Sequence, residues 1–428
     1  MKNQIIRVGS PWERRLQLLF GAVLLARLLY PFFNSPMEHL FSDPQRHWEN
    51  GERFLHPTVM GSSDPFLYQL WIYLLQQMAH GSTPTILLGC GFLCASMPYG
   101  WYRALREFQP RPWALGGAVL IGLIPESISM YGYFMNETLL LSLMGFCLWL
   151  TLRAHRKQTV AAFALAGAVW LCAACTRTVA LPLAVGCMAW LWAVQPQRLQ
   201  KALVAVAITL LLLVPAGFHA QAKLGFFSPF GNLYFNEIYS ASGKREIVAD
   251  YGPDGRYNFG CPSFYNPTFY PFSAWMTDRS GVVSIAVDLT RGRPAWKAER
   301  ARVGEQRSFP RWRQRWEDFL YLMFGQSWPN SDHSSLLGWL TLWSRWIWAP
   351  LIAVVVYGTF RRGFRGRDYL LPLCGLGTVA LLLLQGEGVM EARYRIPVDA
   401  ILVCSAWVMM WRRAERRSSS TVSPVTGR

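Results

Sequence analysis

The sequence predicts an all-α polytopic membrane protein with about ten transmembrane helices and a mixed, loop-rich extracytoplasmic domain. Hydrophobic residues make up 52% of the chain and charged residues only 16%, against about 25% charged residues in a typical soluble domain. The apolar residues gather in long runs that alternate with short basic clusters. This alternation is the pattern of a chain that crosses a membrane repeatedly.

Ten apolar runs are candidate spans, although several are short for a hydrocarbon core of about 30 Å unless the helices have ragged ends. They are residues 16–33, 84–101, 113–131, 136–152, 158–175, 180–194, 201–218, 337–358, 369–386 and 395–411. The first run lacks a small-residue cleavage site, so we interpret it as an uncleaved span. Residues 67–80 are short and carry three glutamines, which favours an interfacial helix.

The positions of Lys and Arg predict the orientation, because basic residues concentrate in short cytoplasmic loops. With both termini cytoplasmic, the basic clusters fall inside, whereas the short outside loops hold few arginines. The inside residues are Arg14, Arg15, Arg103, Arg106, Arg111, Arg153, Arg156, Lys157, Arg198, Lys201, Arg361, Arg362, Arg365, Arg367, Arg412, Arg413, Arg416 and Arg417. We therefore expect a multi-pass membrane protein with both termini in the cytoplasm, and we interpret the net charge of +17 as topology rather than nucleic-acid binding.

This topology divides the chain into three parts. Residues 1–218 form an N-terminal membrane module with an acidic first outside loop, 34–66. Residues 219–335 form the extracytoplasmic domain, and residues 336–428 form the last membrane helices and a basic cytoplasmic tail. Nine basic residues in 291–315, close to Trp312 and Trp316, predict interfacial helices on an anionic surface. Alternatively, some of these arginines bind an anionic acceptor.

The first outside loop offers a candidate catalytic carboxylate. Asp43 follows the first span by about ten residues, so it lies close to the membrane face. A carboxylate there can deprotonate an acceptor hydroxyl or hold a divalent metal beside a phosphate. The competing interpretation is a solvated acidic loop.

A short outside turn before the last span offers a candidate phosphate site, in the sequence Glu391-Ala392-Arg393-Tyr394-Arg395-Ile396-Pro397. The planar fork of an arginine pairs well with phosphate oxygens. Positive charge outside also runs against the orientation bias, although ordinary flanking charge is the alternative.

Other charged residues lie at or within spans, where they are costly unless they face protein or water. Glu126 and Glu137 flank an apolar turn, and either of them can face the same cavity as the candidate phosphate site. Arg177 lies at an outer span end. Arg27 and Arg345 lie within spans. For Arg345 we expect snorkelling to the interface.

Several function classes lack their motifs: there is no Walker loop, no GxGxxG after a strand, no HExxH and no GxSxG. A cytosolic nucleotide therefore has no recognisable site. The energy for any group transfer must then come from an activated donor that is already in the membrane. Internal repeats are not evident, which weakens a transporter interpretation.

The order of these features resembles the membrane-embedded glycosyltransferases of the C-type (GT-C) fold, which include the protein O-mannosyltransferases and the bacterial lipid A aminoarabinose transferases. Four places carry the resemblance. They are Arg27 before Asp43, Pro65-Phe66-Leu67-Tyr68 at the start of an apolar helix, Glu137 at the start of a middle span, and the turn from Glu391 to Pro397.

The resemblance implies site residues. Asp43 corresponds to the family's catalytic base, and Arg393 or Arg395 corresponds to the arginine that holds the donor phosphate, with Arg177 as a further candidate. The remaining candidates, for substrate positioning, are Glu126, Glu137, Glu391, Asp64 and Tyr394. Many relatives have Asp-Glu in the first loop, whereas here Pro44 follows Asp43, so an adjacent acidic pair for metal binding is missing.

The expected activity is transfer of a sugar from a polyprenyl-phosphate donor to an extracytoplasmic acceptor, which is a cell-envelope glycan, a lipid or a protein. The expected partners are that donor, the acceptor and membrane lipids, with no nucleic acid. No cofactor is certain, and a divalent metal is possible. The resemblance also implies a location in the inner (plasma) membrane. The alternatives are a non-enzymatic flippase or assembly protein, or a polymerase, for envelope polysaccharide.

Overall fold

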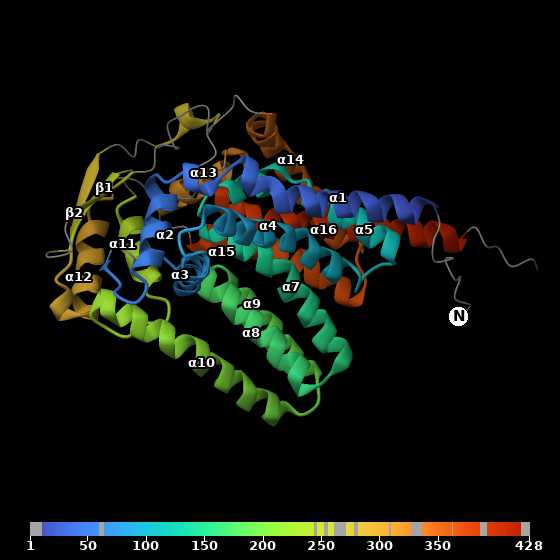
Figure 1. Cartoon of the computed structure of the whole chain (residues 1–428), viewed down its shortest axis with the longest axis horizontal. Coiled ribbons are helices and arrows are strands. Elements are labelled where there is room, and N and C mark those ends of the chain that lie inside the picture. Colours follow the sequence, from blue (N-terminus) through green and yellow to red (C-terminus); the bar gives the residue numbers. More distant parts are fainter. Residues whose placement is uncertain are drawn as a thin grey trace, which may run out of the picture.

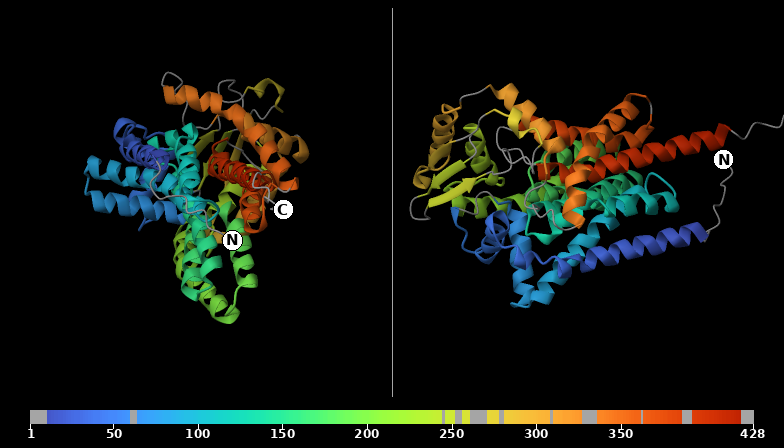
Figure 2. Two further views of the ribbon diagram at one scale, coloured as in Figure 1. Left: turned by 90° about the vertical axis from the view of Figure 1, so that its right-hand side faces the viewer. Right: turned by 90° about the horizontal axis from the view of Figure 1, so that it is seen from above.

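The computed structural model describes residues 11–59, 64–243, 246–251, 256–260, 271–277, 281–307, 310–326, 336–361, 363–385 and 392–420. Within these residues the protein is predominantly helical, with long helices on one side and a small unit containing a sheet at the other end (Figure 1). The start of α1 and the end of α16 lie at the end of the molecule opposite the sheet (Figures 1 and 2).

Each predicted span coincides with a helix or a bent helix pair. The helices are α1 (Pro11–Phe33), α4 (Thr83–Leu105), α5 (Arg111–Gly122), α6 (Pro125–Ser129), α7 (Asn136–Lys157), α8 (Val160–Thr176), α9 (Ala180–Val194), α10 (Arg198–Leu224), α14 (Leu336–Phe360), α15 (Leu370–Gln385) and α16 (Ile396–Ser420). The predicted break between the third and fourth spans is real, because η3 (Met130–Gly132) ends before α7 begins.

Six stretches of the described residues are long and apolar enough to cross a membrane, and they contain α1, α7, α10, α14, α15 and α16. The segment from α5 to η3 qualifies as a seventh if its two halves, bent by 64°, form one span. Helices α8 and α9 are apolar but shorter than 18 residues. The structure therefore supports a helical, multi-pass membrane protein, while the count of ten spans remains a prediction.

Two short helices occupy the predicted first outside segment and its continuation. They are α2 (Ser42–Glu52) and α3 (Phe66–Ala79), which pack against each other. Figure 1 shows α3 nearly end-on while α1 and α16 run across the page, so α3 lies at a steep angle to the long helices.

The unit between α10 and α14 is mixed, as expected. It contains α11 (Asn232–Ala241), β1 (Glu246–Asp250), β2 (Arg256–Gly260), β3 (Val282–Ala286), α12 (Arg293–Gly304) and α13 (Arg311–Phe324). The strand order is β2-β1-β3, with β2 antiparallel and β3 parallel to β1. Alternate residues of β1 and β3 are buried, which is the period-2 pattern of a sheet with one covered face.

The predicted interfacial helices behave differently from each other. Helix α12 buries Trp296 and Val303 in the core of the sheet unit, so it is a structural helix of that unit. Helix α13 exposes Trp312 and Trp316 and packs against α14 and α15. Only α13 therefore has the aromatic and basic exposed face expected of a helix at a membrane surface.

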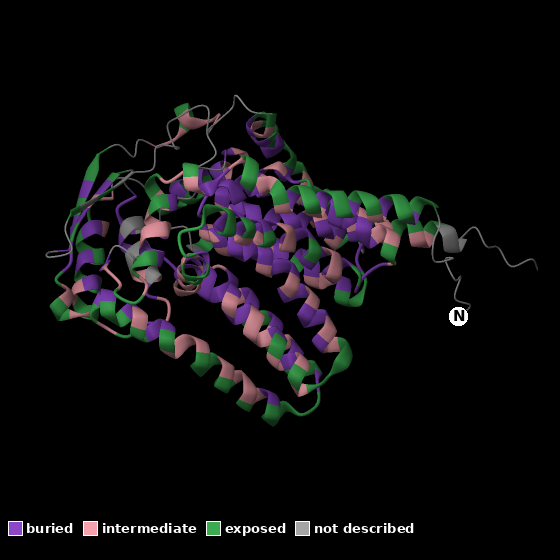
Figure 3. Ribbon diagram, in the orientation of Figure 1, coloured by how far each residue is buried: buried purple, intermediate pink, exposed green. Residues whose placement is uncertain are grey.

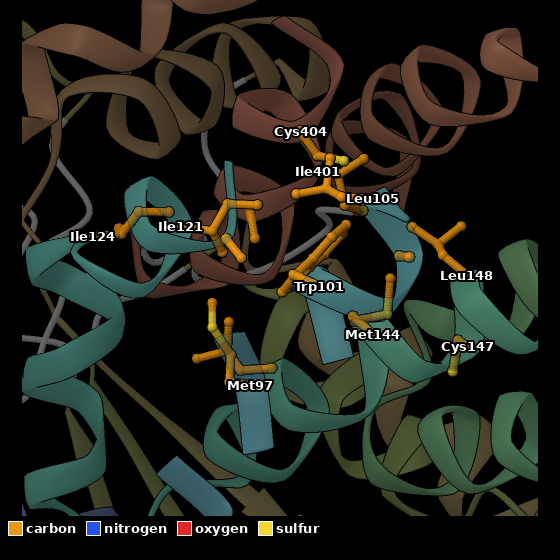
Figure 4. Packing of buried hydrophobic residues seen from close by; sticks show 14 of the residues in the cluster. Met97, Trp101, Leu105, Ile121, Ile124, Met144, Cys147, Leu148, Ile401 and Cys404 are labelled. Carbon is orange, nitrogen blue, oxygen red and sulfur yellow. The ribbon is translucent and has the colours of Figure 1, made fainter. Parts of the chain in front are cut away.

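The core of the bundle lies where α1, α4, α5, α7 and α16 meet. Trp101 of α4 is fully buried among apolar side chains that include Met144 of α7 and Ile401 of α16 (Figure 4). Burial is densest in this central group of helices, whereas α10 at the margin is largely exposed (Figure 3). This rigid centre supports both ends of the molecule.

A close approach of α4 and α7 depends on glycine. A Cβ atom on Gly145 would lie 2.6 Å from the backbone carbonyl carbon of Gly100 and 2.6 Å from the backbone nitrogen of Trp101. Backbone atoms cannot move aside as a flexible side chain can, so even one methyl group must separate the two helices.

We expect Gly145→Ala to destabilise the protein by about 1–3 kcal/mol, the usual cost of overpacking. The matched control is Gly186→Ala in α9, where a Cβ atom has nothing within 4 Å. Thermal unfolding of the two purified variants measures the difference. Equal midpoints for both variants would show that α4 and α7 do not approach this closely.

Candidate functional site

Asp43 lies in the first turn of α2, next to a strained residue. Ser42 has φ = 47°, in the left-handed region that residues other than glycine seldom adopt. Such conformations persist only where the surrounding structure enforces them, and they cluster at functional sites. The turn at Ser42 brings Asp43 to the start of α2, where the helix dipole favours a negative charge.

Two arginines hold the Asp43 carboxylate. Arg46, one turn later in α2, pairs with Oδ1, and Arg393 donates to Oδ2 at 2.9 Å. Burial alone would raise the pKa of Asp43, but the positive charges of Arg46 and Arg393 prevail and hold that pKa well below its ordinary range. The side chain keeps 19% of its surface exposed, so the carboxylate remains accessible.

Asp64 holds Arg46 in place next to Asp43. Its carboxylate lies 3.1 Å from Arg46, 3.1 Å from Nδ1 of His47 and 2.6 Å from the donating Nδ2 of Asn50. Burial opposes ionisation here too, yet Arg46 and His47 lower the pKa of Asp64 well below its usual range. The side chain is fully buried, so Asp64 positions Arg46 rather than substrate, in contrast to the predicted role.

Glu137 forms the second carboxylate centre, at the start of α7. Arg177, directly after α8, pairs with its Oε1, and Nε of Arg393 lies 3.3 Å from the same oxygen. The guanidinium of Arg177 also lies 4.4 Å from the ring centroid of Tyr394, a cation–π distance. Predicted site residues from four parts of the chain are thus in contact.

These contacts form one row of alternating charges, which we call the charged row. Its members are Asp64, Arg46, Asp43, Arg393, Glu137 and Arg177. The row contains three carboxylates and three arginines, so its formal charges cancel. An anion can bind only by taking an arginine away from a carboxylate partner. Arg393 bridges the partly exposed Asp43 and the buried Glu137.

The charged row does not suit a divalent cation at Asp43. Both carboxylate oxygens face guanidinium groups, and a second cation beside Arg46 and Arg393 would be repelled. Among the residues that the structure describes, no group of three or more His, Cys, Asp or Glu side chains is placed to hold a metal. The described residues around Asp43 therefore do not fit a divalent metal.

Arg395 lies apart from the charged row, contrary to its predicted role in phosphate binding. Its guanidinium is fully buried and pairs with Glu126 and with Asp399 at 3.1 Å. It also donates to the backbone carbonyls of Leu322 and Met323, at 2.7 and 3.0 Å. All three nitrogens thus have acceptors inside the protein, and Arg395 ties α16 to α6 and α13.

The surroundings of Arg395 also correct two further predictions. Glu126 is fully buried against Arg395 and is not part of the charged row, in contrast to its predicted role in positioning substrate. Arg345 does not snorkel: only 7% of it is exposed, and the charge of Glu126 acts on it. The cluster balances Glu126 and Asp399 with two arginines.

The sequence analysis did not single out three residues of the two charged clusters, and one residue that it did predict lies outside the described part of the chain. Arg46 and His47 are three and four residues from Asp43, a spacing that places side chains on one face of a helix and was available as a signal. Asp399 is likewise four residues from Arg395. Glu391 lies outside the described residues.

In comparisons with known proteins, no family model matches this chain and no curated protein matches it significantly.

Proposed function

We propose that this protein is an integral membrane glycosyltransferase with a GT-C-like fold of about ten spans, which moves a sugar from a polyprenyl-phosphate donor to an extracytoplasmic acceptor. Asp43 is the base, Arg393 and Arg177 hold the donor phosphate, and Glu137 and Tyr394 position these arginines. The protein lies in the inner membrane with both termini in the cytoplasm.

One observation carries the proposal. Asp43 and Arg393 are 350 residues apart in the sequence, and their side chains lie 2.9 Å from each other. A carboxylate that can accept a proton therefore stands directly beside an arginine that can bind a phosphate. Transfer from a sugar phosphate uses both kinds of group, because a base activates the attacking hydroxyl and a cation stabilises the leaving phosphate.

The charged row explains how an ionised but weakly basic carboxylate becomes a base. Without substrate, Arg46 and Arg393 both stabilise the negative charge of Asp43. A donor phosphate competes for Arg393 because charge-assisted pairing with phosphate is strong. Once Arg393 turns to the phosphate, Asp43 keeps only Arg46, its pKa rises towards the ordinary value, and it accepts a proton more readily.

The proposed reaction is a single displacement. The acceptor oxygen forms a bond to the anomeric carbon while the bond from that carbon to the phosphate oxygen breaks. The hydroxyl proton passes to Asp43, and the bonding electrons leave with the polyprenyl phosphate. Arg393 and Arg177 stabilise the charge that develops there, and the configuration of the sugar is inverted.

The positions of the charged row and of the basic end of α16 at opposite ends of the helix bundle support the proposed topology. The charged row contains the start of α2, the start of α7 and the turn before α16, which the topology places outside. The sheet unit lies at this end, and the basic end of α16 lies at the other (Figure 1). A lipid-linked donor in the outer leaflet would thus reach Arg393 without crossing the membrane.

Transfer of label from radiolabelled polyprenyl-phosphate sugars to a membrane extract tests the function. We expect purified wild-type protein to transfer label from at least one such donor and to release the polyprenyl phosphate. Folded protein that turns over none of the donors would contradict the proposal and favour a flippase. A product that grows in chain length would instead identify a polymerase.

A further inference from the structure

A second basic site lies at the opposite end of the bundle. An open pocket of about 410 Å³ is lined by Phe364, Arg365, Gly366, Tyr369 and Arg416. It lies between the loop after α14, which includes the short helix η8 (Gly366–Tyr369), and the last turns of α16. None of these residues belongs to the charged row, so the pocket needs an explanation of its own.

The walls of this pocket are held in place by a salt bridge. Arg412 donates to both oxygens of Asp368, at 2.6 and 3.0 Å, and Asp368 is fully buried. Phe364 is buried, and its ring centroid lies 5.9 Å from that of Tyr369. These contacts fix η8 against α16, so the pocket exists before any ligand arrives.

The pocket is strongly positive. Residues 361–369 and 412–417 contain eight arginines and only two acidic residues, Asp368 and Glu415. Arg412 pairs with both of these acids, the second at 3.0 Å. In these two segments the arginines therefore outnumber the carboxylates by eight to two.

Tryptophans indicate the depth of the pocket relative to a membrane. Trp113 lies 5.2 Å from Trp407 and 5.3 Å from Trp411, measured between ring centroids. Tryptophan is enriched at the level of lipid headgroups. Arg416 follows Trp411 by five residues, which is about 8 Å along a helix axis. A bilayer whose headgroups lie at the level of these tryptophans would place its phosphates near the opening of the pocket.

We propose that this pocket binds the headgroup of an anionic phospholipid, with the lipid phosphate held by Arg365 and Arg416. The guanidinium groups supply planar forks of donors that match phosphate oxygens. Tyr369 provides an aromatic wall and a hydroxyl beside them. This inference does not depend on the proposed transferase activity, since it rests on the other end of the bundle.

Lipid binding to the purified full chain tests the proposal, with native mass spectrometry as the readout. Phosphatidylglycerol is the anionic probe and phosphatidylcholine the neutral one. We expect the double variant Arg365→Gln/Arg416→Gln to bind phosphatidylglycerol about 30-fold more weakly, because each basic residue at an anionic surface contributes about fivefold. Binding of phosphatidylcholine should not change.

The matched control is Arg413→Gln/Arg417→Gln, which removes the same charge from α16 outside the pocket lining. An equal loss of phosphatidylglycerol in both double variants would overturn the proposal and show that only general surface charge matters. Full binding by Arg365→Gln/Arg416→Gln would overturn it too. Inorganic phosphate that displaces the lipid at equal concentration would identify a small-anion site instead. Unchanged helical circular dichroism confirms that each variant is folded.

Discussion

Replacing Asp43 with Asn should reduce sugar transfer by about 10²- to 10⁴-fold, the usual contribution of a general base. Asparagine has the same shape but cannot accept the proton of the acceptor hydroxyl. The substitution should leave the fold intact, because Arg46 keeps Asp64 as its partner and Arg393 keeps Glu137. The measurement is the initial rate of label transfer from a polyprenyl-phosphate sugar at saturating donor.

The donor KM separates a base from a binding residue. In Asp43→Asn, Arg393 loses a carboxylate partner and is more available to phosphate, so the donor KM should not rise. If Asp43 acted only by positioning substrate, KM would rise while kcat changed little.

Glu49→Gln is the matched control for this substitution. Glu49 is another carboxylate of α2, and it accepts a hydrogen bond from Gln45 at 2.7 Å. It is not part of the charged row, so the variant should keep its activity. An Asp43→Asn protein that retained more than about a tenth of the wild-type rate would exclude Asp43 as the base.

Replacing Arg395 with Met should destabilise the protein by about 3–5 kcal/mol, the cost of removing one partner from a buried ion pair. Glu126 and Asp399, both fully buried, would lose the arginine that joins them. The carbonyls of Leu322 and Met323 would lose a donor as well. A large fall in the midpoint of thermal unfolding, or failure to obtain folded protein, is the expected result.

Arg393→Met is the matched control, since Arg393 lies only two residues away and pairs with two carboxylates of the described residues, Asp43 and Glu137. Each of these two carboxylates has a second arginine partner, because Asp43 keeps Arg46 and Glu137 keeps Arg177. We expect Arg393→Met to stay folded and to lose donor binding. The reverse outcome, with Arg395→Met stable but unable to bind donor, would reassign the phosphate site to Arg395.

A rescue variant distinguishes lost charge balance from lost packing. The double variant Arg395→Met/Asp399→Leu removes one buried carboxylate together with the arginine. Replacement of buried ion pairs by apolar residues of similar size is often tolerated, so this variant should recover part of the stability. No recovery would indicate that packing around the arginine side chain dominates.

The sequence by itself determined the helical membrane architecture, because apolar runs bounded by basic residues have few stable arrangements other than helices in a bilayer. It also identified most members of the charged row. Asp43, Glu137, Arg177 and Arg393 stand at the ends of apolar runs, where a charge is conspicuous in the sequence. Their local setting was therefore readable without a structure.

Only the tertiary structure decided the surroundings of two neighbouring arginines. Arg393 and Arg395 are equivalent in the sequence, but they point to different surroundings, one beside a partly exposed carboxylate and the other into the protein interior. The same applies to Asp64 and Glu126, which became supporting residues through contacts with Arg46 and Arg395. Such pairings join segments tens to hundreds of residues apart, and their energies depend on burial and distance, which no local pattern specifies.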